Sequence, residues 1–185
     1  MSQSESGHTN DIFGDIYEAM RQGDIAFLTF VAEAYPPFPF GQDEGFTRAW
    51  LTHAIHAGHY GAFDWVLNQG VEVNFCDDDG YGPLKSLLEM ERGHHGPSNP
   101  KDLIKWIDRL LLAGANVNFC HTLDETPLHR AAMISSPAVV QHLLDCGADP
   151  HAYDAEYTPV QPIHYAKWSL YRDEVTKILM AAMAR

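Results

Sequence analysis

Three closely spaced histidines come nearest to a residue pattern with chemical meaning in this sequence. His53, His56 and His59 follow one another at intervals of three residues, and side chains at that spacing share one side of an α-helix. A zinc ion could be bound by such a group, with His94 and His95 as further candidates in a nearby segment. The pattern places no carboxylate or thiol beside these histidines, so we expect no metal ion and no cofactor.

The cysteines and the motif content argue against catalysis. The chain has 3 cysteines, and Cys76, Cys120 and Cys146 do not show metal-site spacing. No base is expected next to any of them, so none is a candidate nucleophile. The sequence also contains no G-x-S-x-G motif, phosphate-binding loop or paired-carboxylate motif. We therefore expect no enzymatic activity and no catalytic residues.

Charge and length limit the classes of partner. The chain has 185 residues, enough for one domain with a core, and a formal net charge of −13 from 12 Lys and Arg against 25 Asp and Glu. That charge repels phosphate backbones, so nucleic acid is not an expected partner, whereas encounter with a basic protein is accelerated. The polar N-terminus shows no secretory signal, no apolar run is long enough to span a membrane, and an odd number of cysteines indicates a reducing compartment. We expect a cytoplasmic protein that is monomeric when free.

A repeated five-residue sequence indicates how the chain is organised. Residues 72–76 read EVNFC and residues 116–120 read NVNFC, and each copy closely follows a glycine that ends an apolar helical pattern, Gly70 or Gly114. The next glycine of this kind is Gly147, which lies 33 residues after Gly114. The 44 residues from Gly70 to Gly114 exceed this period by 11, so we expect an insertion between them.

Residues 126–149, TPLHRAAMISSPAVVQHLLDCGAD, closely resemble the ankyrin repeat, which has a period of 33 residues. Thr126 can cap a helix that begins at Pro127, where a missing N–H costs nothing. The resemblance implies that His129, and His164 in a weaker copy, form hydrogen bonds with neighbouring backbone and have no catalytic role.

The resemblance implies an all-α fold, a solenoid of about five helix–turn–helix units with β-turns that project as fingers between units. Weaker copies of the pattern extend it over residues 11–185 as a single domain, after a polar tail at 1–10 that we expect to be disordered. The extra residues fall in an insertion at 89–101, and a shorter loop is expected at 34–46. The units are placed at approximately 11–42, 43–75, 76–119, 120–151 and 152–185.

The usual binding surface of the family is the concave face made by the fingers and the first helices. Each finger of this chain carries at least two carboxylates, and the last three first helices add apolar and aromatic side chains. An apolar centre with a charged rim is typical of specific protein interfaces. We therefore expect Ser86 and Met90 to be exposed on this face. The residues expected to contact a partner are Asp77, Asp78, Asp79, Asp124, Glu125, Asp154, Glu156, Arg130, Met133, Ile134, Tyr165, Trp168, His53 and His56.

These features favour a module that binds another protein. Our first hypothesis is an acidic protein that binds and inhibits one basic partner, such as a toxin or a nucleic-acid-processing enzyme. Small bacterial ankyrin proteins of this kind are similar to immunity proteins that neutralise a cognate secreted toxin. The alternative is a general scaffold or adaptor, or an effector directed at a host cell, which would engage several partners.

Overall fold

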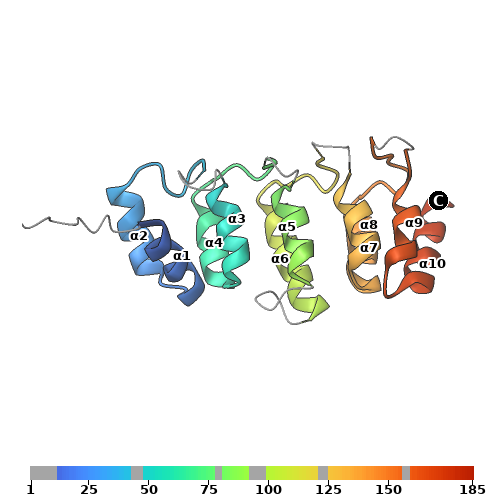
Figure 1. The fold of residues 1–185 in the computed structure, drawn as a ribbon, viewed down its shortest axis with the longest axis horizontal. Coiled ribbons are helices and arrows are strands. Elements are labelled where there is room, and N and C mark those ends of the chain that lie inside the picture. The colour runs from blue at the N-terminus through green and yellow to red at the C-terminus, as the bar shows by residue number, and fades with distance from the viewer. Residues whose placement is uncertain (1–11, 43–47, 78–80, 92–98, 121–124, 156–158) are drawn as a thin grey trace, which may run out of the picture.

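The computed structural model describes residues 12–42, 48–77, 81–91, 99–120, 125–155 and 159–185, and these residues form helices and connecting segments without a β-strand. The helices follow one another in antiparallel pairs that stand side by side along one axis (Figure 1). This arrangement confirms the all-helical solenoid expected from the sequence. The helices are α1 (Ile12–Gln22), α2 (Ile25–Ala34), α3 (Trp50–Ala57), α4 (Tyr60–Asn68), α5 (Pro83–Met90), α6 (Pro100–Leu112), α7 (Pro127–Ile134), α8 (Pro137–Asp145), α9 (Pro162–Tyr165), the 3-10 helix η1 (Ala166–Trp168) and α10 (Arg172–Met183).

The helices form two rows. The first helix of each pair contacts the first helix of the next, from α1 through α3, α5 and α7 to α9, and we call these the first-helix row. The second helices, α2, α4, α6, α8 and α10, are in contact in the same order and form the second-helix row. The segments that join one pair to the next all leave from the same edge of the stack, where the fingers are expected (Figure 1).

The core lies between the two rows and is clearest in the fourth pair. Leu128 and Ala131 of α7, together with Val139 and Leu143 of α8, have no exposed surface. Their spacing of three or four residues puts them on one side of each helix, and a small alanine lets the two helices approach closely. Leu144 lies at the edge of this stripe and is only half-buried.

The segment after α2 contributes a side chain to the core. Phe38 is 1% exposed, and its ring centroid lies 5.0 Å from that of Trp50 and 5.9 Å from that of Trp65. The predicted loop at 34–46 is therefore anchored to the second pair of helices. Residues 43–47 of that loop lie outside the described residues.

The repeated five-residue sequence connects consecutive pairs of helices through its asparagine. Asn74 donates from Nδ2 to the carbonyl oxygen of Gly114 at 3.0 Å and accepts at Oδ1 from the backbone N–H of Asn116 at 2.7 Å. Asn118 makes the same two bonds one unit later, to the Gly147 carbonyl at 3.0 Å and from the Asp149 N–H at 2.8 Å. The two copies are therefore similar because each asparagine holds the next unit in register.

The predicted insertion at 89–101 begins and ends in helix. Helix α5 continues to Met90, and α6 begins at Pro100 after Asn99, whose side chain accepts the N–H of Asp102 at 3.0 Å. Residues 92–98 of the insertion, like the predicted tail at 1–10, lie outside the described residues. No helix in the part of the chain that the structure describes has both the length and the apolar character needed to cross a membrane.

Candidate functional site

The aspartates at the bases of two fingers stabilise the turns themselves. Asp77 accepts the N–H of Tyr81 at 2.7 Å on its side chain, and its own N–H donates to the Tyr81 carbonyl at 3.0 Å. Asp154 accepts the N–H of Val160 at 2.9 Å in the same way and is only 3% exposed. The expectation that both carboxylates face a partner is therefore wrong for Asp154, whose carboxylate is buried and forms hydrogen bonds within the chain.

A chain of contacts connects this aspartate to the fourth pair of helices. The second carboxylate oxygen of Asp154 accepts the hydroxyl of Tyr165 at 2.8 Å, and the Tyr165 ring lies 5.2 Å from the ring of His129. The Nδ1 atom of His129 accepts the N–H of Thr126 at 3.2 Å. Its Nε2 lies 3.1 Å from the carbonyl oxygen of Val160, so Nε2 must carry the proton, because a carbonyl only accepts. The structural role expected for His129 is confirmed.

Two ion pairs connect α5 to the start of α7. The Lys85 ammonium lies 2.9 Å from Glu125, and Arg130 forms an ion pair with Glu89. The ring of Tyr81 lies between them, 5.2 Å from Lys85 Nζ and 6.0 Å from the Arg130 guanidinium carbon. Glu125 and Arg130 were expected to contact a partner, but in this state each is paired within the chain.

A polar hollow of about 220 Å³ opens beside these pairs. It is lined by Arg48, His56, Asp77, Tyr81, Ser86 and Glu89. Burial lowers the pKa of His56 from its ordinary value of 6.5, the charges of Arg48 and His53 lower it further, and Asp77 opposes them. His56 is therefore a neutral hydrogen-bonding group at neutral pH. The charged groups of the hollow are the Arg48 guanidinium and the carboxylates of Asp77 and Glu89, and Glu89 is paired with Arg130.

Several positions expected to be exposed on the first helices are buried. His53 is 6% exposed and lies among the rings of Phe13, Tyr17 and Trp50, with the Phe13 centroid at 4.8 Å. Ser86 and Met90 are also buried. The reason is that a first helix has neighbours on both sides in the row as well as its own partner helix. The surface that it offers to solvent is narrower than the helical period alone suggests.

The exposed aromatic surface lies at the last pair of helices. Trp168 is 58% exposed, its ring is 5.7 Å from that of Tyr165, and Lys167 Nζ lies 3.9 Å from its centroid. Met133 and Ile134 of α7 are half-buried, and Ile134 packs against the core. Trp168 is therefore the most accessible member of the apolar cluster that the sequence predicted.

Two exposed residues beside Trp168 were missed by the sequence reasoning. Leu170 is 92% exposed and Tyr171 is 45% exposed, both in the turn before α10. The signal was present, since the corresponding turns of earlier pairs contain Gly58–His59 or Ser135–Ser136, which are polar or small. Because these two exposed side chains do not contribute to the core, they indicate a surface for contact with another molecule.

Four of the expected contact residues cannot be placed. Asp78, Asp79, Asp124 and Glu156 lie in the finger segments outside the described residues. The acidic edge expected from the fingers is therefore not tested, and it stays a prediction.

The comparison with known families agrees with the fold. Residues 123–155 match the family model of the ankyrin repeat, and they include α7, α8 and the start of the following finger. These residues therefore contain an ankyrin repeat. The chain is also 29% identical, over 93 residues, to an ankyrin repeat protein of Acanthamoeba polyphaga mimivirus. That alignment covers 49% of this chain and 52% of the viral protein, so the chain spans about half the length of the relative it matches.

Ankyrin repeats are modules of protein–protein interaction, and the repeat at residues 123–155 indicates an interaction module in this chain. The first-helix row and the bases of the fingers correspond to the surface that the ankyrin resemblance predicted for binding. The described part of this surface combines the polar hollow, the paired charges of α5 and α7, and the exposed Trp168.

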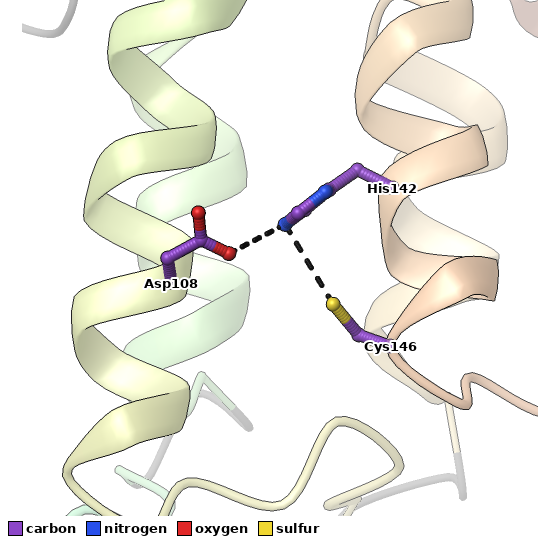
Figure 2. A group of neighbouring side chains, drawn as sticks. All are labelled: Asp108, His142 and Cys146. Atoms are coloured by element: carbon purple, nitrogen blue, oxygen red, sulfur yellow. Dashed lines mark hydrogen bonds and ion pairs between the residues drawn. The ribbon is translucent and has the colours of Figure 1, made fainter.

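A cluster of three polar side chains lies on the other side of the stack, in the second-helix row. His142 Nε2 of α8 is 2.7 Å from Asp108 Oδ1 of α6 and 3.6 Å from Cys146 Sγ (Figure 2). The expectation that no base lies next to a cysteine is therefore wrong for Cys146. Sequence reasoning missed this group because Asp108 and His142 come from different units, 34 residues apart.

The histidines that first suggested a metal do not form such a group. His53 is buried among aromatic rings, and His59 Nδ1 accepts the N–H of Ala62 at 3.4 Å to cap α4. Among the described residues, the set of three potential ligands brought together is Asp108, His142 and Cys146. His94 and His95 fall outside the described residues.

Proposed function

We propose that this chain binds a basic protein segment across its first-helix row and fingers, and that Trp168 anchors the contact. The observation that carries the proposal is the exposure of Trp168, at 58%, beside Tyr165. Tryptophan is among the residues most enriched at the energetic centres of interfaces, because it buries a large area at little cost in conformational entropy. Leu170 and Tyr171 extend the apolar surface around it.

The charge of the chain supports a basic partner. The formal net charge of −13 produces a long-range field that attracts cations. Two cations of the row that could repel such a partner, Lys85 and Arg130, are already neutralised by Glu125 and Glu89. The acidic finger residues outside the described part of the chain would strengthen the same field.

We propose further that the chain inhibits the basic protein that it binds. An acidic protein that covers the cationic substrate site of a toxin or a nucleic-acid-processing enzyme would block it by occlusion, as an immunity protein does. The chain itself would act without catalysis and as a monomer when free. A cytoplasmic location fits the cysteines, since none of the three forms a disulfide.

The test is affinity capture with the purified chain from a lysate of the source organism. We expect one dominant partner of basic pI, captured at about 0.05 M salt and largely released at about 0.5 M, because surface charge attraction is screened. Trp168→Ala is expected to weaken binding by about 30-fold or more, the cost of losing an interface anchor of about 2 kcal/mol. For the inhibitor form, the activity of the captured protein should fall in proportion to added chain.

The matched control is Phe30→Ala, which removes a similarly exposed ring, at 65% exposure, from α2 of the second-helix row. It should leave capture unchanged. Equal loss of binding in both variants, or capture that is insensitive both to salt and to Trp168→Ala, would contradict the proposal.

A further inference from the structure

We propose that Asp108, His142 and Cys146 form a zinc site that joins the third and fourth units on the second-helix row. One potential ligand atom from each residue lies within 4.8 Å of the others. A thiolate, an imidazole and a carboxylate are the three ligand types that zinc prefers, and three protein ligands with a water in the fourth position form a common open zinc site. Asp108 is exposed, and His142 and Cys146 are half-buried, so an ion can reach all three.

The geometry fits a tetrahedral ion. With zinc–sulfur and zinc–nitrogen bonds of ordinary length, the sulfur and nitrogen ligands of a tetrahedral site are about 3.6 Å apart. The distance from Cys146 Sγ to His142 Nε2 is 3.6 Å. Asp108 Oδ1 lies 2.7 Å from the same nitrogen and would have to move to about 3.4 Å, a shift that an exposed carboxylate can make.

The same geometry argues against a nucleophilic cysteine. In a Cys–His–Asp catalytic arrangement the carboxylate binds one imidazole nitrogen and the thiol faces the other. Here the carboxylate and the thiol both approach Nε2 (Figure 2). The imidazole is therefore not placed to relay a proton from the thiol to the carboxylate. A metal ion would displace the proton of the thiol.

The preceding unit shows what this position looks like without such a group. Arg109 of α6 forms an ion pair with Asp64 of α4. Counted back from the glycine that follows each second helix, Arg109 takes the position of His142, and Asp64 takes the position of Asp108. Where the third unit has Arg109 and Ala113, the fourth has His142 and Cys146. The guanidinium, which cannot bind a metal ion, is replaced by an imidazole, and a thiol is added one helical turn away.

The test is metal binding by the full chain after treatment with a chelator and a phosphine reductant. Calorimetry with zinc chloride should show one ion per chain, with an enthalpy that depends on the buffer because a proton is released. Cobalt chloride should produce the intense absorption of a thiolate–cobalt bond together with the visible bands of a tetrahedral site.

The decisive variant is His142→Arg, which recreates the Arg109–Asp64 pair at the next unit and so should keep the fold. Loss of an outer hydrogen-bond partner costs zinc sites about 10- to 100-fold in affinity, so loss of a direct ligand should cost more than about 100-fold. Cys146→Ser should abolish the thiolate–cobalt absorption, and Cys120→Ser should leave it intact. Absence of saturable zinc binding, or unchanged affinity in His142→Arg or Cys146→Ser, would overturn the proposal.

Discussion

His129 shows how one buried side chain serves two units of the solenoid. Its ring accepts from Thr126 in its own unit and donates to the carbonyl of Val160 in the next finger. The bond from Thr126 requires the neutral imidazole with its proton on Nε2, because a protonated ring has no acceptor left for Thr126. The position therefore makes stability depend on pH.

Burial lowers the pKa of His129 from its ordinary value of 6.5, and the hydrogen bond to Val160 opposes the shift. The unfolded chain therefore takes up a proton on this residue at a higher pH than the folded chain. We expect the free energy of unfolding to be highest above pH 6.5 and to decrease as the pH falls below it. Urea denaturation at about pH 7.5, 6.5 and 5.5 measures this dependence.

His129→Gln is expected to lose about 2 kcal/mol at pH 7.5, about 1 kcal/mol for each of the two hydrogen bonds removed, and to show a weaker dependence on pH. The exposed His151→Gln is the control, with an expected change below about 0.5 kcal/mol. A wild-type stability that is constant across this range would contradict the assignment of a neutral buried imidazole.

At the scale of elements, the contacts between units depend on backbone groups as well as on apolar surface. The carbonyls of Gly114 and Gly147 follow the ends of second helices, in residues with φ of 100° and 91°, a conformation that favours glycine. Asn74 and Asn118 satisfy these carbonyls from the preceding unit. Each asparagine therefore fixes the position of one unit on the next.

Asn118→Ala removes both bonds that connect the third and fourth units at this edge. We expect it to lower the free energy of unfolding by about 1–2 kcal/mol, because two partners in the backbone lose their hydrogen bonds. Gln141→Ala, which removes only a bond to Asp145 within α8, should cost less than about 0.5 kcal/mol. Equal changes in the two variants, measured by urea denaturation, would show that the asparagine does not hold the units together.

The fold could be predicted because its signals are local. The cap at Thr126, the apolar stripes of α7 and α8 and the glycine that follows each second helix lie within one repeat. The exposed surface could be predicted only in part, because it depends on what the neighbouring units cover. His53 was misjudged because the helices next to it bring aromatic rings over its side chain.

The side-chain contacts that could not be predicted from the sequence lie between units. Glu125 and Arg130 were expected to contact a partner protein, but the groups that they bind in the chain come from α5, 40 and 41 residues earlier. The cluster of Asp108, His142 and Cys146 depends on the register between α6 and α8. Periodicity within one unit does not specify that register.

At the scale of the whole molecule, the two rows have different chemistry. The first-helix row offers a polar hollow and an exposed tryptophan, whereas the second-helix row carries the cluster of His142. In a solenoid each unit contacts only its neighbours, so a partner that spans the first-helix row should stabilise several units at once. Binding should therefore slow the hydrogen exchange of backbone amides in several units along the first-helix row.

Hydrogen–deuterium exchange of the chain, alone and with its captured partner, tests the central claim most directly. We expect the partner to slow exchange in peptides covering 81–91 and 162–171, and to leave peptides of α6 and α8 unchanged. Protection confined to α6 and α8, with none near Trp168 or the hollow, would contradict binding through the first-helix row.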